Sequence, residues 1–291
     1  MHYLLLTTLI WAFSFGLIGN ALQGLDPVAV AGARLTIAFL VFLPLLRPGR
    51  ISFRERCHLA AIGAVQFGTM YLCYMSAFRF IPSHLVALFS VLTPLYVVVI
   101  HDISRKAFHW RYLLAALLSV AGASVIKIQG GETGSLWIGF ALMQVSGIAF
   151  AFGQIAYRNW KLRRTTLNDR EVFGFLYAGG AATALAAAFL ITPGPAKLLE
   201  ASGTELGVIA YLGAVASGLG FFLWNKGATL CSAGALAAFN NALVPVAMFA
   251  SLFVFGEIKG ATTGDMARLL AGGGLVAGAV LIGRRREKAK P

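Results

Sequence analysis

Long apolar stretches separated by short polar segments run along the whole chain. A helix needs about 20 mostly apolar residues to cross a bilayer core. Stretches of about that length cover residues 3–20, 28–47, 57–79, 83–101, 110–128, 135–157, 172–192, 206–227, 233–256 and 266–283. The pattern predicts an all-α integral membrane protein with ten transmembrane helices. The connections are too short to hold a separate soluble domain.

Composition agrees with this interpretation. Of the 291 residues, 58% are hydrophobic and 12% are charged, whereas a soluble domain carries roughly 25% charged residues. The first apolar stretch has no small-residue cleavage site at the right distance, so we expect a retained span and not a signal peptide. Cys57, Cys73 and Cys231 show no CxxC spacing, which indicates neither a disulfide framework nor a metal cluster. We expect no metal and no cofactor.

Basic residues are distributed unevenly between the two sides of the predicted bundle. If both termini are cytoplasmic, 18 of the 24 Lys and Arg residues lie in inner segments, five lie in outer segments, and Arg34 lies within a span. The positive-inside rule then predicts cytoplasmic N- and C-termini in the bacterial inner membrane. It also accounts for the net charge of +13 without a nucleic acid partner.

The two halves of the sequence resemble each other. "AFSFGLI" at 12–18 matches "AFAFGQI" at 149–155, and "LLAALLSVAGASVI" at 113–126 matches "LLAGGGLVAGAVLI" at 269–282. Between them, 85–97 aligns without gaps to 236–248 and pairs Pro94 with Pro245. Five spans per half is an odd number, so the second half must enter from the opposite side. We therefore predict inverted repeats at 1–130 and 131–291, an arrangement typical of secondary transporters with a site at the midplane.

Four of these stretches carry a family resemblance. They are "TLIWAFSFGLIG", "AGARLTIAFLVFL", "LVALFSVLTPLYVVV" and "GALAAFNNALVPVAMFASLFVFGE". In order and spacing they resemble the EamA family of the drug/metabolite transporter superfamily. The resemblance implies two inverted five-helix EamA repeats, a central cavity and alternating movement of organic metabolites. The first half departs from it in "IHDI", where His101 and Asp102 replace an expected Gly–Glu pair.

Polar and aromatic residues at helical spacing are the candidates for the cavity lining. Trp11 and Ser14 share a helix face, as do Gln66, Met70 and Tyr74. Aromatic residues near span ends also form interfacial belts, which is the alternative for Tyr157 and Trp224. The full set of predicted substrate-binding residues is Trp11, Ser14, Arg34, Gln66, Met70, Tyr74, Gln154, Tyr157, Trp224, Asn225, Asn240 and Asn241.

Arg34 is the one basic residue placed well inside a span. An intramembrane charge costs about 2.5–3.5 kcal/mol on insertion scales, so the side chain should face a cavity or a partner. One hypothesis is that Arg34 binds a substrate carboxylate. The other is an internal tie to backbone carbonyls or to an outer-end acid, either Asp26 or Glu257.

The stretch "FNNALVPV" at 239–246 places two amides and a proline inside an apolar run. Because Pro245 aligns with Pro94, the prolines are predicted to be paired helix bends, which free backbone carbonyls one turn earlier. Asn240 and Asn241 have no amide counterpart in the first half. They are candidates for substrate contact, with interhelical hydrogen bonding as the alternative.

All eleven acidic residues lie at span ends or in loops. Proton-coupled efflux of cations usually relies on an intramembrane carboxylate, so a zwitterion or weak anion is favoured as substrate. We predict a secondary transporter, a monomer or homodimer, that moves a small organic metabolite by alternating access, with amino acid export as the first guess. The alternatives are a multidrug or cation efflux carrier and, from another class, a lipid-processing membrane enzyme or structural subunit. No catalytic constellation of side chains is found, so we do not expect an enzyme.

Overall fold

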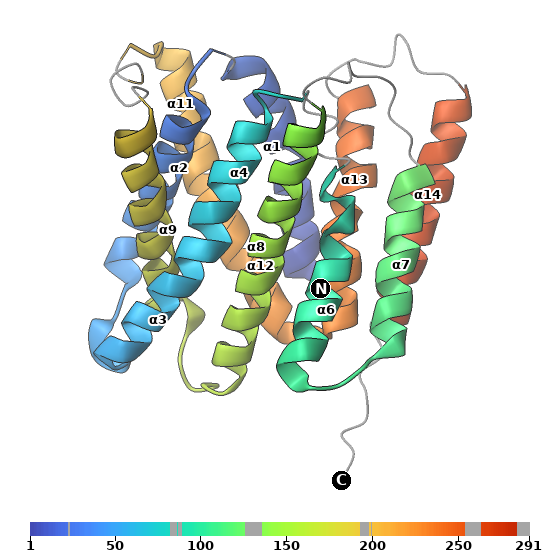
Figure 1. Ribbon diagram of the computed structural model, residues 1–291, viewed down its shortest axis with the longest axis horizontal. Coiled ribbons are helices and arrows are strands. Elements are labelled where there is room, and N and C mark those ends of the chain that lie inside the picture. Colours follow the sequence, from blue (N-terminus) through green and yellow to red (C-terminus); the bar gives the residue numbers. More distant parts are fainter. Residues whose placement is uncertain are drawn as a thin grey trace.

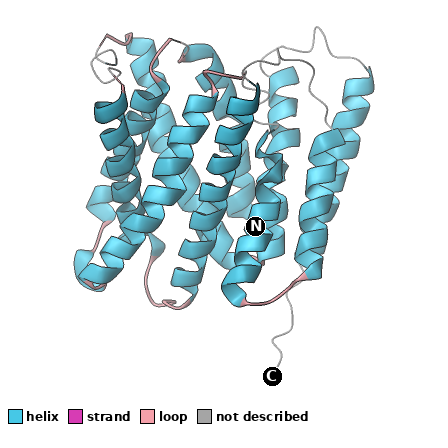
Figure 2. Cartoon of the chain, viewed as in Figure 1, coloured by secondary structure: helices cyan, strands magenta, loops and turns pink. Residues whose placement is uncertain are grey.

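The computed structural model describes residues 1–22, 24–81, 86, 89–125, 136–192, 198, 200–253 and 263–283. In these ranges the regular elements are helices, and no strand occurs (Figure 2). The helices stand side by side as long rods with short turns at both ends (Figure 1). The expected all-α membrane fold is confirmed.

The described residues form ten rods, close to the ten predicted spans. Two of the rods contain a π-helical segment in their middle, and one contains a 3₁₀ turn. The rods are α1 (His2–Ala21), α2 (Pro27–Phe42), α3 (Phe53–Gly63) with π segment Ala64–Thr69 and α4 (Met70–Ala77), turn Ser90–Leu92 with α6 (Thr93–Arg105), α7 (Trp110–Val125), α8 (Leu136–Leu162), α9 (Asp169–Ile191), α11 (Gly203–Tyr211) with π segment Leu212–Leu219 and α12 (Gly220–Leu230), α13 (Ala233–Phe253) and α14 (Thr263–Gly283).

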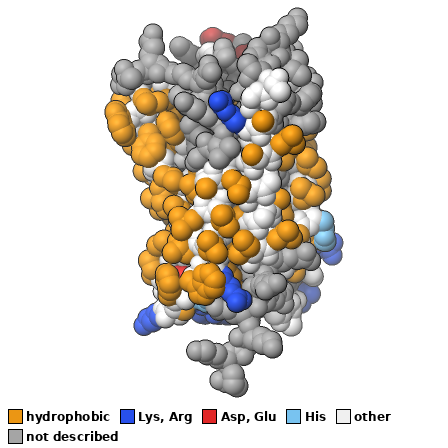
Figure 3. Space-filling model, turned by 90° about the vertical axis from the view of Figure 1, so that its right-hand side faces the viewer, with side chains coloured by type: hydrophobic (Ala, Val, Ile, Leu, Met, Phe, Trp, Pro, Cys, Tyr) orange, Lys and Arg blue, Asp and Glu red, His pale blue; other side chains and the backbone are white. Residues whose placement is uncertain are grey.

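The outer surface suits a lipid environment. Five described helical rods are long and apolar enough to cross a membrane. Large apolar side chains are exposed on them, such as Phe189, Leu190 and Ile191 at the end of α9. On the face in Figure 3, hydrophobic side chains cover the middle, and Lys and Arg lie mostly toward the lower end.

The two halves share a helix cap and a π-helical segment that the comparison of their sequences had not detected. The third rod begins with a capping box in which Ser52 and Glu55 satisfy each other's backbone groups, and the eighth begins with the same box made by Ser202 and Glu205. Both rods then pass through a π segment. α3 begins at the lower edge of the molecule and α11 at the upper edge (Figure 1). These two equivalent rods therefore start from opposite edges, as inverted halves require.

Packing between the halves follows the same symmetry. α2 packs on α9 and on the second π segment, while α9 packs on α3 and on the first π segment. α7 packs on α14 in a similar cross-half pair. The predicted boundary at 130/131 lies outside the described residues and stays a prediction.

The paired prolines occupy different positions in their helices. Pro94 stands in the first turn of α6, directly after the 3₁₀ turn Ser90–Leu92. The first turn of a helix tolerates proline because its N–H groups have no intrahelical partner. The described residues before this turn, Val86 and Phe89, are helical as well, so the bend at Pro94 stays a prediction. Pro245 lies inside α13, where helix continues from Ala233 to Phe253, and its bend stays a prediction.

Two glycines allow α3 and α9 to approach each other closely. A Cβ atom added to Gly63 would stand 1.9 Å from the carbonyl oxygen of Leu176, and one added to Gly179 would stand 1.8 Å from that of Ala60. Both obstacles are backbone atoms, which cannot rotate away. The close contact between the two helices, which belong to different halves, therefore requires glycine at both positions.

We expect Gly179→Ala to separate α3 from α9 and to destabilise the protein by about 1–3 kcal/mol, the range typical of overpacking. Thermal unfolding of the detergent-purified protein would measure the change. Gly207→Ala is the matched control, because a Cβ there meets nothing within 4 Å and alanine is the better helix former. Equal melting temperatures for the two variants would contradict the packing argument.

Candidate functional site

A cavity of about 110 Å³ lies between the two halves of the bundle. Its described lining comes from seven rods, with α1, α2, α4 and α6 from the first half and α8, α12 and α13 from the second. The lining residues are Trp11, Ser14, Arg34, Met70, Tyr71, Tyr74, Ser90, Thr93, Met143, Ser146, Gly147, Phe150, Phe221, Trp224, Asn240 and Leu243.

Seven of the predicted site residues line this cavity. They come from five rods that are distant in sequence: Trp11, Ser14, Arg34, Met70, Tyr74, Trp224 and Asn240. The Ser14 hydroxyl donates to the carbonyl oxygen of Trp11 at 2.8 Å, and the Asn240 amide donates to that of Leu236 at 2.8 Å. Both side chains are thus held against their own helices. Their contact with substrate stays a prediction.

Three predicted site residues instead join helices in a polar layer beside the cavity. The Gln66 amide donates to Asn225 Oδ1 at 3.0 Å, and Asn225 Nδ2 donates to the carbonyl oxygen of Phe221 at 2.9 Å. Gln154 Oε1 accepts a hydrogen bond from Trp224 Nε1 at 2.9 Å. Gln66, Gln154 and Asn225 are fully buried and are not among the described lining residues. They connect the third, sixth and eighth rods.

The other two predicted residues are also engaged in hydrogen bonds away from the cavity lining. Tyr157 donates its hydroxyl to Asp169 Oδ1 at 2.6 Å. Asn241 donates to the carbonyl oxygen of Val91 at 3.0 Å and to Ser119 Oγ at 3.4 Å. Asn241 therefore makes the interhelical bonds that were the alternative to substrate contact.

Arg34 is 2% exposed and lines the cavity from α2. Its Nη2 donates to the hydroxyl of Tyr71 at 2.9 Å, and the guanidinium carbon lies 4.9 Å from the centre of that ring. Nη1 stands 3.8 Å from the sulfur of Met75. Among the described residues, Nε has no hydrogen-bond partner and no carboxylate forms an ion pair with Arg34.

The suggested tie between Arg34 and Asp26 is wrong. Asp26 pairs with Arg79 and caps α2 by accepting from the backbone N–H groups of Val28 at 3.0 Å and Ala29 at 2.9 Å. The Asp26 carboxylate is thus bound by the start of α2 and by Arg79, and not by Arg34. Glu257, the other suggested partner, lies outside the described residues.

The aromatic residues Trp11, Phe150, Phe221 and Trp224 form one wall of the cavity. The distance between ring centres is 4.9 Å for Trp11 and Phe221 and 5.1 Å for Trp11 and Trp224. It is 5.8 Å for Phe150 and Phe221. Both indole N–H groups are occupied, that of Trp11 by the carbonyl oxygen of Ala216 at 2.9 Å and that of Trp224 by Gln154. The indole rings are therefore oriented before any ligand binds.

The π segment Leu212–Leu219 supports this wall and the arginine together. Its irregular geometry leaves carbonyl oxygens available to side chains: Ala216 accepts from Trp11, and Ser217 and Gly218 accept from Tyr177 at 2.9 and 2.5 Å. The hydroxyls of Ser217 and Tyr71 are 2.8 Å apart. A continuous chain of contacts thus runs from the π segment through Tyr71 to the Arg34 guanidinium.

Sequence reasoning missed several lining residues, including Tyr71, Thr93, Ser146, Phe150 and Phe221. Tyr71 is adjacent to the predicted Met70, and a search for a partner at the depth of Arg34 could have found it. Phe150 belongs to the repeated "AFAFGQI" stretch and could have been read as more than scaffold. Which side of an apolar helix faces the cavity is set by its neighbours, so spacing alone could not choose among these positions.

Comparison with known proteins places the chain in a family. A profile described as the EamA-like transporter family matches residues 1–128, and relatives of 37% identity extend over nearly the whole chain. The chain belongs to the EamA-like transporter family. The resemblance read from its sequence is confirmed.

The similar curated proteins are named transporters. A probable biotin transporter of Pseudomonas aeruginosa is 37% identical over 99% of both chains. The biotin transporter of Escherichia coli is 37% identical over 88% of this chain and 85% of its own. A probable terminal-alkyne amino-acid exporter of Streptantibioticus cattleyicolor is 26% identical over 99% of this chain and 96% of its own.

Fold comparison agrees with the family assignment. A crystal structure matches with a TM-score of 0.74 at 18% identity, covering 97% of this chain and 98% of that chain. Together with the relatives, the ten-helix fold identifies a multi-pass membrane transporter of a small metabolite. The family and the relatives are transporters, so the protein is not an enzyme.

The hydrogen bond between Gln66 and Asn225 can be used to test whether Asn225 stabilises the fold or binds substrate. Asn225→Leu leaves the buried Gln66 amide without its acceptor, and we expect a loss of about 1–3 kcal/mol in stability. Adding Gln66→Leu removes both partners and should recover most of the loss, as thermal unfolding of the single and double variants would show. Substrate affinity should change little, because Asn225 is not among the described residues of the cavity lining. A large fall in affinity at unchanged stability would instead make Asn225 a substrate contact.

Proposed function

We propose that this carrier moves a small organic monocarboxylate with a largely apolar body, and that biotin is the first candidate substrate. Arg34 is the observation that carries the proposal. It is the one charged side chain among the described residues of the lining. A buried cation is strongly favoured to acquire an anionic partner, and a guanidinium suits a carboxylate because it can donate two parallel hydrogen bonds.

The rest of the lining supports an apolar body with a neutral polar end. The aromatic wall and the side chains of Met70, Met143 and Leu243 offer apolar surface. Ser90, Thr93, Ser146 and Asn240 offer hydroxyl and amide groups. Biotin combines a valerate carboxylate, an apolar thioether ring and a neutral urea group, which corresponds to these three kinds of surface. Two relatives of 37% identity are named biotin transporters.

Amino acid export is the second candidate. It is favoured by the likeness to the terminal-alkyne amino-acid exporter and by aromatic rings that can bind an ammonium group through cation–π contact. However, the described lining holds no carboxylate to pair with an ammonium group. The same feature disfavours cation efflux. A monocarboxylate therefore accounts better for the charge of the cavity than a zwitterion or a cation does.

Alternating access supplies the mechanism. The cavity lies where the inverted halves meet, and closing one end while opening the other would expose Arg34 to each side of the membrane in turn. We propose the bacterial inner membrane as the location, with both termini in the cytoplasm, since the basic segments between the rods are concentrated on that side. Substrate bound at Arg34 would form a neutral ion pair while the cavity is closed, and only the substrate would leave on the other side.

Transport into proteoliposomes tests the substrate. We expect vesicles containing the purified protein to accumulate labelled biotin, with competition by unlabelled biotin and weak competition by biotinamide, which lacks the anionic group. Protein-free vesicles are the control. Transport of labelled amino acids without transport of biotin would replace the first candidate by the second.

Arg34→Gln tests the role of the guanidinium. Loss of a charge-assisted bond to carboxylate is worth about 1.5–3 kcal/mol, so we expect biotin affinity to fall roughly tenfold to a hundredfold, while the affinity for biotinamide changes little. Arg50→Gln, at an exposed position, is the control for the same chemical change. Equal losses for biotin and biotinamide, together with a lower yield of folded protein, would show that Arg34 is structural.

A further inference from the structure

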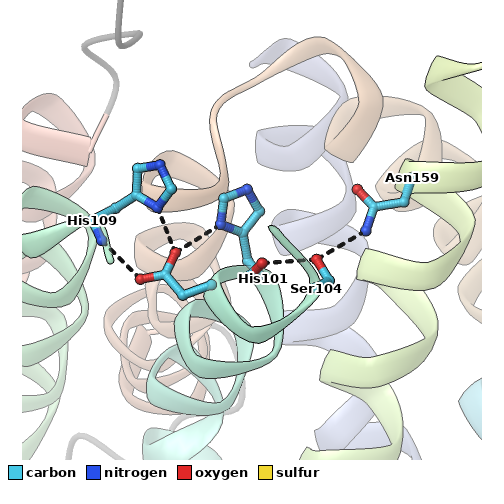
Figure 4. A network of polar contacts seen from close by, with 5 residues as sticks. His101, Ser104, His109 and Asn159 are labelled. Carbon is cyan, nitrogen blue, oxygen red and sulfur yellow. Dashed lines mark hydrogen bonds and ion pairs between the residues drawn. The ribbon is translucent and has the colours of Figure 1, made fainter. Parts of the chain in front are cut away.

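A second cluster of polar side chains lies outside the described cavity lining, where α6 ends and α7 begins. His101 Nδ1 is 3.0 Å and His109 Nδ1 is 2.6 Å from the same atom, Asp102 Oδ1. One ligand atom from each of the three residues lies within 4.8 Å of the others. Figure 4 shows the imidazole rings of His101 and His109 on neighbouring helix ends, with dashed lines for their contacts to the carboxylate that they share.

The turn between the two helices builds this cluster. Lys106 adopts a left-handed conformation, with φ of 49°, at the end of α6. The backbone N–H of Ala107 then bonds to the carbonyl oxygen of Asp102 at 3.1 Å, which reverses the chain. His109 is thereby brought back onto Asp102, and its backbone N–H donates to Asp102 Oδ2 at 2.9 Å. One carboxylate oxygen is held by backbone, and the other faces two imidazoles.

Neighbouring groups hold the imidazole of His109 and the end of α6 in place. The ring of Tyr112 is stacked on His109 with 5.0 Å between centres and an interplanar angle of 17°. The Ser104 hydroxyl donates to the carbonyl oxygen of His101 at 2.7 Å, and Asn159 of α8 donates to Ser104 Oγ at 3.2 Å. His101 is 6% and Asp102 is 9% exposed. The donor atoms are thus largely withdrawn from water and pre-oriented.

We propose that His101, Asp102 and His109 bind one divalent transition-metal ion, with Zn²⁺ as the representative. Two imidazole nitrogens and one carboxylate oxygen are a donor set that suits zinc and its neighbours better than Ca²⁺ or Mg²⁺, which take oxygen ligands. Three protein ligands leave a fourth position for water. The imidazoles would bind through Nδ1 after their protons move to Nε2, so that metal replaces the two hydrogen bonds to Asp102.

The proposal concerns a site that the spacing of residues in the sequence did not indicate. Motif searches look for cysteines or for histidines one helical turn apart, whereas His109 reaches Asp102 only through the left-handed turn.

The positive charges around the cluster limit its affinity for a metal ion. Arg105 and Lys106 are exposed nearby, and their positive charges oppose the ion. The charge of Arg158 also acts on His101. Its guanidinium is held in place because it donates to the carbonyl oxygens of Ala228 and Cys231.

Titration of the untagged full-length protein with Zn²⁺ in detergent, followed by calorimetry, tests the site. We expect one ion per chain, and we expect Asp102→Asn and His109→Asn each to weaken binding by at least about tenfold, as loss of a metal contact does. Asn at position 109 keeps an N–H donor for the carboxylate, so the local fold should survive. His58→Asn, at an exposed histidine of α3, should leave the affinity unchanged.

Co²⁺ absorption gives an independent reading that needs no variant. Bound to this site, Co²⁺ should show visible d–d bands of a low-coordinate nitrogen and oxygen environment, and Zn²⁺ should displace them. No saturable band in the wild-type protein would overturn the proposal, even if the variants fail to fold. Zn²⁺ binding that is equal in wild type and in both ligand variants, or that is lost in His58→Asn, would overturn it as well. Transport of biotin is not part of the readout, so the two proposals fail separately.

Discussion

Backbone groups buried in a bilayer have no water to bond with, and the structure is organised around satisfying them internally. Regular helix meets this requirement for most of the chain. The two π segments depart from regular helix, and each occurs in the middle of a rod that packs against the other half. At Leu212–Leu219 the freed carbonyls are satisfied by Trp11 and Tyr177. The irregular backbone and the aromatic side chains of the cavity therefore stabilise one another.

The same constraint sorts the polar side chains into two groups. Gln66, Gln154, Asn225 and Asn241 are fully buried and hydrogen-bonded to neighbouring helices. They link neighbouring helices, and contact with substrate stays a prediction for them. Arg34 differs, because it lines the cavity and, within the described part of the chain, lacks a carboxylate partner. A charge in that situation is expensive unless a ligand completes it, which links the electrostatics of the cavity to the anionic substrate proposed for it.

The capping boxes and π segments occur in both halves, but the side chains at other aligned positions make different contacts. The alignment pairs Asn241 with Ser90, yet Ser90 lines the cavity while Asn241 bonds to Val91 and Ser119. Pro94 follows a 3₁₀ turn, whereas Pro245 lies within continuous helix. The His101–Asp102–His109 cluster stands at the end of the fourth rod, where the sequence departs from the family pattern. Scaffold features are thus repeated, whereas the polar side chains at equivalent positions differ between the halves.

The sequence alone predicted the membrane helices, their division into inverted halves and the family, because a segment that crosses a lipid bilayer must be a long run of apolar residues. It also identified Arg34, since a lone charge in an apolar span is conspicuous. Only the tertiary structure decided which faces of the helices meet. Gln66 and Met70 share one face by spacing, but Gln66 reaches Asn225 while Met70 reaches the cavity. In an apolar rod every face is compatible with lipid, so the assignment rests on neighbouring helices and on turns such as Lys106, which no local pattern records.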